Sequence, residues 1–272
     1  MIRDITIGQF FPGKSFIHKL DPRTKLLLTI AYIVLLFIVR NPLPMLGCTV
    51  LALAFVAIAH IPPKIVLKGV KPILILVAFT AVINMFYTDG GTVLFDWWIF
   101  KLTTKGLVTS AVLCVRIVCL IVTTSLLTYT TSPIALTDAI EYLLGPLKYI
   151  KVPVHDFAMM MTIALRFIPT LVEETDKIMN AQKARGADID HGSLIARVKA
   201  MIPVLIPLFV SAFRRASDLA TAMECRCYRG GEGRTKLKKL SMSLRDLVGF
   251  LVFAALFTAV VLLDFVPFLT FA

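Results

Sequence analysis

The stretch GQFFPGKS, residues 8–15, has the residue types and the spacing of a phosphate-binding loop. The pattern G-x-x-x-x-G-K-[ST] of nucleotide-binding proteins is matched by Gly8, Gly13, Lys14 and Ser15. Such a loop needs a sustained helix after it, whose N-terminal N–H groups face the phosphates. Pro12 offers no N–H, and Pro22 limits any helix after the motif to about two turns. The sequence therefore predicts an interfacial strap over 1–24 in place of an ATP site.

The composition is that of a membrane protein. Hydrophobic residues make up 58% of the 272 residues and charged residues 17%, whereas soluble domains have about 45–50% and about 25%. A membrane-spanning helix needs about 20 apolar residues. Runs near this length cover 25–40, 43–60, 72–88, 106–129 and 245–266. The sequence predicts an all-α polytopic membrane protein with about five transmembrane helices.

The charges predict an orientation for these spans. The net charge is +12, and a positive-inside bias explains it most simply in a polytopic chain. The N-terminal segment is basic, the loop after the first span has only Arg40, and the next loop carries Lys64, Lys68 and Lys71. We expect a multi-pass protein of a prokaryotic cell membrane, with a cytoplasmic N-terminus and an extracellular C-terminus.

Residues 130–244 differ from the spans because they hold most of the charged residues. Apolar residues nevertheless recur at helical spacing in 156–184 and 204–224, which predicts long amphipathic helices on the inner side of the membrane. The expected domains are a strap (1–24), a four-helix transmembrane region (25–129), a cytosolic or interfacial region of long helices (130–244), and a final transmembrane helix with an extracellular C-terminus (245–272).

The 130–244 region contains an internal repeat. KIMNAQKARGA (177–187) aligns with DLATAMECRCY (218–228), which places Arg185 opposite Arg226. Each arginine stands near a predicted helix end between small residues. It could simply meet the helix dipole there. Two matching copies favour docking into a carboxylate-bearing groove on two similar partners, since the planar guanidinium makes bidentate contacts.

Three segments resemble the transmembrane T-component of energy-coupling factor (ECF) transporters, the vitamin and metal importers of the ABC class. They are HKLDPRTKLLL (18–28), RFIPTLVEETDKIMNAQKARGAD (166–188) and RRASDLATAMECRCYRGGEGRTKL (214–237). The resemblance implies that each arginine tip docks on one of two cytosolic ABC-type ATPase subunits. The tip residues are Ala184, Arg185 and Gly186, and Cys225, Arg226 and Cys227. The second tip departs from the family's Ala-Arg-Gly pattern at both flanking positions.

The resemblance also implies that the long helices carry a small, exchangeable, membrane-embedded S-component that binds the solute. The surface we assign to it comprises Met159, Met160, Met161, Ile168 and Leu171. Supporting positions are the small residues Ala181 and Ala222 and the aligned charges Glu173, Glu174, Arg214 and Arg215, which could bridge if the helices cross. ATP and Mg²⁺ would belong to the ATPase partners, and this chain would bind no cofactor or metal directly.

The function expected is energy coupling for micronutrient uptake, with a vitamin as the expected solute. A dedicated cobalt or nickel T-component is the first alternative, and a membrane enzyme or a permease with its own solute path are others. Scattered histidines and few polar residues within the spans disfavour the last two. The basic turn at 229–239 favours an anionic leaflet over nucleic acid. Arg116, in the middle of a span, is expected to pair with carbonyls or hydroxyls such as Thr123 or Ser125.

Overall fold

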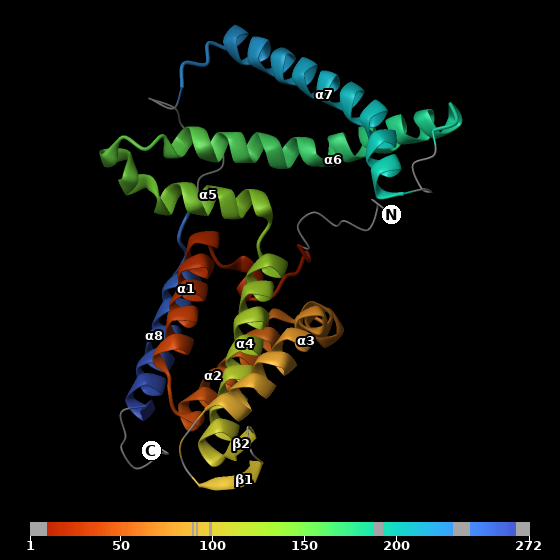
Figure 1. The fold of residues 1–272 in the computed structure, drawn as a ribbon. Coiled ribbons are helices and arrows are strands. Elements are labelled where there is room, and N and C mark those ends of the chain that lie inside the picture. The colour runs from red at the N-terminus through yellow and green to blue at the C-terminus, as the bar shows by residue number, and fades with distance from the viewer. Residues whose placement is uncertain are drawn as a thin grey trace. The chain divides into compact units, whose positions relative to one another are not determined.

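The computed structural model describes residues 10–88, 90, 92–97, 100–187, 193–230 and 240–264 (Figure 1). Two compact units divide the chain. Among the described residues, the bundle unit comprises those in 10–139 and 240–264, and the long-helix unit comprises those in 140–230.

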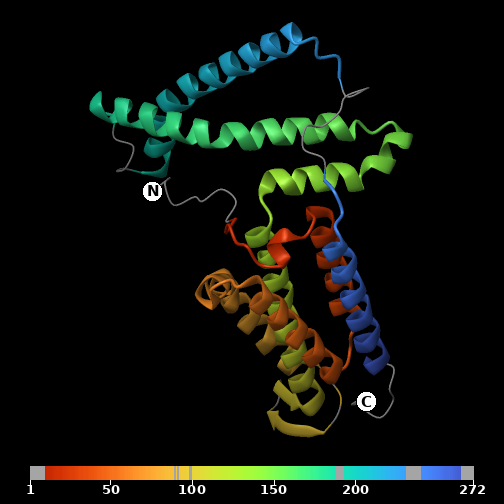
Figure 2. The ribbon, with the colours of Figure 1, turned by 180° about the vertical axis from the view of Figure 1, so that it is seen from behind.

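The bundle unit consists of five helices preceded by the short 3-10 helix η2 (Ile17–Lys19) (Figure 2). The helices are α1 (Pro22–Ile38), α2 (Pro42–Ala59), α3 (Pro63–Tyr87), α4 (Thr104–Thr130) and α8 (Leu244–Asp264). The first three begin with proline, whose fixed φ suits the first helical position. Asp21 caps α1 by accepting the N–H of Arg23 at 2.9 Å, and Thr103 caps α4 by accepting that of Gly106 at 3.0 Å.

The core of the bundle unit lies where α1, α2, α4 and α8 meet. Tyr32, Leu35 and Leu36 of α1 are almost fully buried there, together with Cys48 of α2 and Phe253 of α8. The Tyr32 hydroxyl donates to the Cys48 carbonyl at 2.9 Å, which satisfies the only polar atom of that side chain. The helices of this unit are therefore held by a continuous apolar core.

Two details of the bundle unit differ from the sequence-based expectation. The third span was expected from residue 72, but α3 begins at Pro63 and keeps Pro72 inside it, so Lys64, Lys68 and Lys71 lie on a helix and not in a loop. The stretch before α4 was expected to be a loop, but it forms an antiparallel hairpin of β1 (Val93–Trp97) and β2 (Phe100–Thr103). Valine, tryptophan and phenylalanine in this stretch favour strands.

Length and composition alone select five helices of the described chain as able to cross a membrane. They are α2, α3, α4, α7 (Leu194–Cys225) from Ile195 onward, and α8. The all-α polytopic class is thereby confirmed. The set differs from the expected spans, because α1 has only 17 residues while α7, expected to be amphipathic, has an apolar centre.

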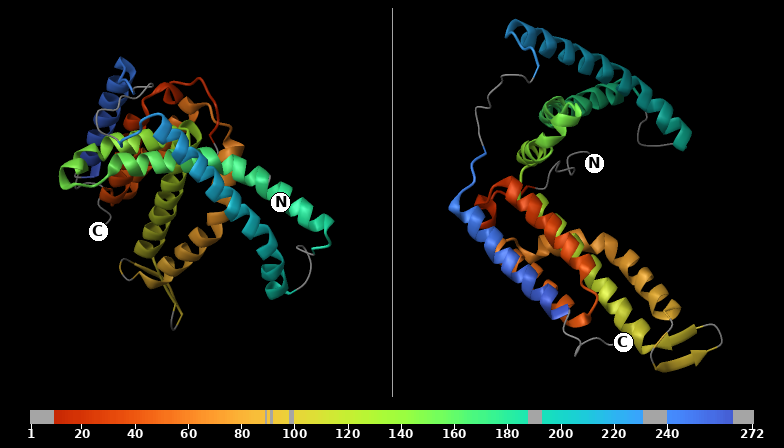
Figure 3. Two further views of the ribbon diagram at one scale, coloured as in Figure 1. Left: turned by 90° about the horizontal axis from the view of Figure 1, so that it is seen from above. Right: turned by 90° about the vertical axis from the view of Figure 1, so that its left-hand side faces the viewer.

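The long-helix unit is built on α6 (Val154–Ala184) and α7, which cross each other (Figure 3). They have 31 and 32 residues and are therefore each roughly 45 Å long. Before them, α5 (Pro133–Leu143) runs across the boundary between the units, followed by the 3-10 helix η3 (Gly145–Ile150). Pro169 lies inside α6, and Pro203 and Pro207 lie inside α7, where each removes a helical hydrogen bond.

Candidate partner-docking site

The two arginines of the sequence repeat occupy equivalent positions at the ends of the long helices. Arg185 is the C-cap of α6 and Arg226 is the C-cap of α7. In α6 the N–H of Ala187 donates to Gln182 and that of Gly186 to Lys183, both at 3.0 Å. This pair of bonds is the Schellman pattern that terminates a helix.

The end of α7 repeats the same hydrogen bonds at the matching positions. The N–H of Tyr228 donates to Met223 at 3.0 Å, and that of Cys227 donates to Glu224 at 2.8 Å. The two ends therefore share one backbone geometry, and both arginines are exposed. Each guanidinium projects from a defined, pre-ordered helix end.

The residues after the two arginines both adopt a left-handed backbone conformation, but its free-energy cost differs between them. Gly186 has φ +89°, which glycine adopts freely, while Cys227 holds φ +57° with a side chain. Glycine is the usual residue at such a helix end, and Gly230 and Gly231 follow Arg226 in the sequence. The helix ends earlier, at Cys225, and the left-handed residue is Cys227. Gly231 lies outside the described residues.

The small residues expected to support the tips lie one turn before the arginines. Ala181 and Ala222 are both exposed, and the Ala181 carbonyl accepts the N–H of Arg185 at 3.2 Å. Ala184 and Cys225, the last helical residues, are exposed as well. No bulky side chain stands at these positions, so a partner can approach either guanidinium along its helix.

A polar contact fastens α6 to α7 at their crossing. The Arg215 guanidinium donates to Glu174 at 2.7 Å, and the Ser211 hydroxyl donates to the other oxygen of the same carboxylate. The hydrogen bond from Ser211 and the Arg215 guanidinium hold the pKa of Glu174 below its usual value, so the carboxylate stays charged at neutral pH. The aligned pair Glu173 and Arg214 is exposed.

The five residues predicted to contact the S-component do not form a single surface in the structure. Met159 and Leu171 line an apolar groove of about 290 Å³ between α6 and α7, together with Leu219 and Met223. Met160 and Met161 lie outside the groove and are each 53% exposed, and Ile168 is half-buried. Met159 therefore lines the groove, whereas Met160 and Met161 do not.

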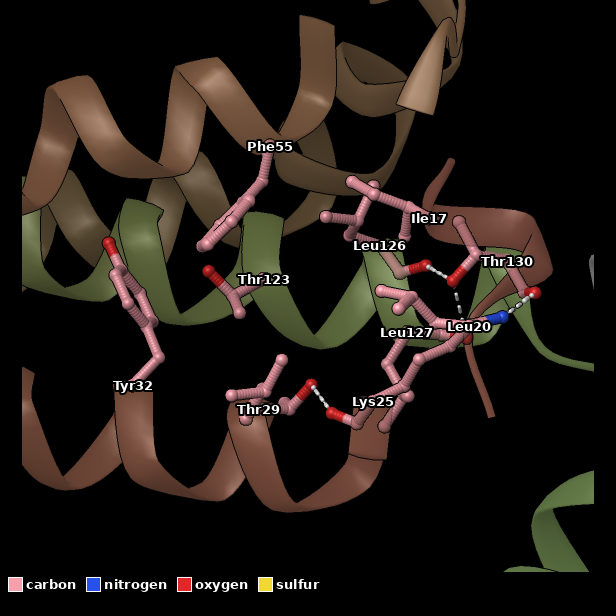
Figure 4. Close-up of a pocket in the computed structure, with 11 residues that line it drawn as sticks. Ile17, Leu20, Lys25, Thr29, Tyr32, Phe55, Thr123, Leu126, Leu127 and Thr130 are labelled. Atoms are coloured by element: carbon pink, nitrogen blue, oxygen red, sulfur yellow. Dashed lines mark hydrogen bonds between the residues drawn. The ribbon is translucent and has the colours of Figure 1, made fainter. Parts of the chain in front are cut away.

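A second cluster of charges lies in the bundle unit and was not singled out from the sequence. Lys25 is buried, and its Nζ donates to the main-chain oxygens of Thr130 at 2.9 Å and His18 at 3.2 Å (Figure 4). The buried carboxylate of Asp246 accepts the N–H of Asp21 at 2.7 Å. An apolar cavity of about 70 Å³ lies beside Lys25. The HKLDPRTK stretch therefore joins η2, α1, α4 and α8.

Arg116 was expected to pair with carbonyls or hydroxyls, and it does bind a carbonyl. Thr123 and Ser125, which were suggested as partners, do not bind it in the described structure. The Nη2 of Arg116 donates to the Val39 carbonyl at 2.6 Å, just after the end of α1. The partner is 77 residues away in sequence, so spacing gave no signal for it. The bond satisfies a carbonyl that α1 leaves free at its C-terminus.

The phosphate-loop pattern does not form a phosphate loop. Gly8 lies outside the described residues, residues 10–14 form no helix or strand, and between Ser15 and the start of α1 at Pro22 there is only the three-residue η2. The His18 ring is hydrogen-bonded on both sides. Its Nδ1 lies 2.7 Å from Ser15 Oγ, and its Nε2 donates to the Phe11 carbonyl at 3.0 Å. Burial lowers the pKa of His18. Three phenylalanines of this strap are exposed: Phe10, Phe11 and Phe16.

The described residues therefore define a polytopic membrane protein with a bundle of apolar helices and a crossed pair of long helices that expose two matched arginines. Residues 13–237 match the family CbiQ, described as cobalt transport protein. The chain is 54% identical over 268 residues to the energy-coupling factor transporter transmembrane protein EcfT of Ruminiclostridium cellulolyticum, covering 98% of this chain and 100% of that protein.

Similar matches extend to other bacteria. Proteins of the same name from Clostridium kluyveri and Bacillus subtilis are 55% and 46% identical, covering 92% and 94% of this chain and 93% and 98% of those proteins. The chain belongs to the CbiQ family and is a transmembrane T-component of the ECF class.

Proposed function

We propose that this T-component transmits ATP-driven motion of two cytosolic ATPase subunits to a membrane-embedded S-component during micronutrient uptake. The observation that carries the proposal is the pair of matched helix ends, in which Arg185 and Arg226 are C-caps of the same hydrogen-bonded motif. Two equivalent docking elements fit two equivalent partners. ATP and Mg²⁺ then belong to those partners.

The chemistry of docking follows from the exposed guanidinium groups. Each can enter a groove bearing carboxylate or carbonyl acceptors and form two parallel hydrogen bonds. Truncating one partner of such a desolvated contact costs about 2–5 kcal/mol. Loss of either arginine is therefore enough to release one ATPase.

The crossing of α6 and α7 supplies the mechanical link. The bonds from Ser211 and Arg215 to Glu174 join the two helices at one carboxylate. When the ATPases close on ATP, the helix ends move toward each other, and the pinned crossing forces the remainder of each helix to rotate. Pinning prevents the helices from simply sliding past each other.

The S-component is proposed to rest on the apolar side of this crossed pair. α7 exposes large apolar side chains along its centre, among them Ile206, Phe209 and Phe213, which is 73% exposed. Exposed apolar surface of this extent needs an apolar neighbour, which we propose to be the S-component as well as lipid. The positive-inside rule applied to the basic N-terminal segment supports a position of these helices at the inner membrane surface, with the N-terminus in the cytoplasm and the C-terminus outside.

Charge reversal at the arginines tests the proposal. Arg185→Glu and Arg226→Glu should each abolish uptake and co-purification of an ATPase, while the S-component remains bound to the chain. Arg166→Glu, an exposed cation of α6 about five turns before Arg185, is the matched control and should leave uptake unchanged. Full uptake by the double variant at Arg185 and Arg226 would overturn the proposal.

A dedicated cobalt or nickel transporter is the second candidate, favoured by the description of the matched family as cobalt transport protein. The exposed methionines favour a shared module, because flexible thioether side chains adapt to several partners. Isolation of the complex from cells distinguishes the two. A shared module should carry several different S-components, whereas a dedicated one should carry a single partner that binds a divalent metal.

A further inference from the structure

In the bundle unit, the turn from α1 to α2 lies at the same end as the start of α4 (Figures 1 and 3). A large basic cleft lies at this end. Its volume is about 820 Å³. Four of its ten lining residues are apolar, and the others provide charge or hydrogen bonds. These polar lining residues are Arg40, Asn41, Thr104, Lys105, Thr109 and Arg116.

Three of the lining residues are cations, and no acidic residue is among the described residues that line the cleft. Arg40 and Lys105 are exposed. Arg116 is half-buried and lies about three turns further along α4 than Lys105. Like charges that share one cavity repel each other more strongly beside apolar walls than in water. An anion in the cleft would offset this repulsion.

Arg116 retains donors that the protein does not use. Its Nη2 donates to the Val39 carbonyl, but its Nε is buried and has no hydrogen-bond partner among the described residues. A buried donor without a partner is costly, and a guanidinium carries five N–H groups in all. Arg116, which lines the cleft, thus carries a cationic group whose hydrogen-bonding capacity the described residues do not fill.

The surrounding elements add donors and remove the competing acid. Lys105, Thr109, Val112 and Arg116 recur along one face of α4, so their side chains line one wall. The cleft is also bordered by the first turn of α4, where the helix dipole is positive, although Thr103 and Thr92 already accept the N–H groups of Gly106 and Thr104. Asp264 is close by, but its carboxylate accepts the N–H groups of Arg40 and Asn41 at 3.4 and 3.2 Å and does not line the cleft.

We propose that this cleft binds a phosphate-type oxyanion, held by Arg116, Lys105 and Arg40. Its sources are the headgroup of an anionic phospholipid in the adjacent leaflet or free inorganic phosphate. Both offer the oxygens that guanidinium groups bind in pairs. The lipid source also explains the apolar walls, which would receive the first carbons of the acyl chains. The site is distinct from the arginine tips and does not depend on the coupling role.

The test compares lipid binding by the purified full-length chain with that of variants in the cleft. Native mass spectrometry should show phosphatidylglycerol retained over phosphatidylcholine of the same acyl chains. The preference should fall about fivefold for each cation removed in Arg40→Gln and Lys105→Gln. Arg116 is left in place because it also holds the Val39 carbonyl. Lys68→Gln, an exposed cation of α3 outside the cleft, is the control.

Inorganic phosphate tests the second source. The cleft binds the free anion if two results are found together. Phosphate raises the thermal unfolding midpoint of the wild-type chain more than that of the Arg40→Gln/Lys105→Gln double variant, and the wild-type chain does not retain phosphatidylglycerol over phosphatidylcholine. A lipid preference that the double variant loses and Lys68→Gln keeps assigns the cleft to a phospholipid. No preference with either probe, or an equal loss in Lys68→Gln, overturns the proposal.

Discussion

The two units of the protein place their charged side chains in opposite ways. In the bundle unit, Asp21, Lys25 and Asp246 are at most 6% exposed. Their polar atoms bind main-chain groups of η2, α1, α4 and the segment before α8. In the long-helix unit, Arg185 and Arg226 are exposed at helix ends. Buried charges must be compensated within the protein, whereas exposed ones stay available to a partner.

The units also differ in whether they bury an apolar core, although both expose large apolar side chains on their outer faces, such as Ile75 and Phe79 of α3 at 80% and 62%. Tyr32, Leu35 and Leu36 of the bundle unit are at most 1% exposed, whereas Phe209 and Phe213 of α7 are more than half exposed. The bundle unit therefore buries a core of its own. Among the described residues the long-helix unit has little core, and α6 and α7 are joined by the polar contacts at Glu174 and by a bond from Gln182 to the Pro203 carbonyl, which is the arrangement expected of an element that is completed by other proteins. Stability and assembly should thus respond to different substitutions.

The largest effect is expected from breaking the buried charge cluster. Lys25→Met removes the donors to the Thr130 and His18 carbonyls and a positive charge close to Asp21 and Asp246, so we expect a loss of about 3 kcal/mol in the free energy of unfolding. Thermal unfolding of the purified protein measures it.

The matched controls are exposed cations. Lys68→Met in the bundle unit, and Arg185→Ala and Arg226→Ala in the long-helix unit, should change the free energy of unfolding by less than about 0.5 kcal/mol. If Arg185→Ala destabilised the protein as much as Lys25→Met, the contrast between the units would be lost.

The second effect concerns the crossing that links the exposed arginines. Glu174→Arg places a second cation against Arg215 and should lower uptake roughly tenfold, within the range that residues of one network show. The exchange Glu174→Arg with Arg215→Glu should restore much of the uptake, because the opposite charges again face each other. Glu173→Arg, on the exposed neighbour, serves as the control. Failure of the exchange to restore any uptake would remove the proposed mechanical role of the bridge.

The comparison also shows which features the sequence could predict. The internal repeat aligned Glu174 with Arg215 and Arg185 with Arg226, and the first pair is joined by a hydrogen bond of 2.7 Å. Both arginines end their helices, as glycine and small residues after them indicated. Local pattern was enough here, since a helix end and a helical face are set by residues only a few positions apart.

Other features depend on residues far apart in the chain. Lys25 binds Thr130, 105 residues away, and Asp21 binds Asp246, 225 residues away, so neither contact has a local signature. The bond from Arg116 to Val39 is of the same kind. The early start of α3 was missed because Lys64, Lys68 and Lys71 were assigned to a loop, whereas the helix extends past the apolar run and keeps Pro72 inside it.

The smallest expected effect is a difference in local stability between the ends of α6 and α7 after substitution of the left-handed residue. Gly186→Ala forces a side chain into the left-handed region and should destabilise the end of α6 by about 1 kcal/mol. Cys227→Gly relieves the same strain at the end of α7 and should stabilise it by about 0.5 kcal/mol, because the more flexible unfolded chain offsets part of the gain. Amide hydrogen exchange at Ala187 and Tyr228, whose N–H groups close the two motifs, reports each end separately. Faster exchange after Cys227→Gly would contradict the equivalence of the two ends, since it would mean that the cysteine side chain supports the second end by contacts that the first does not need.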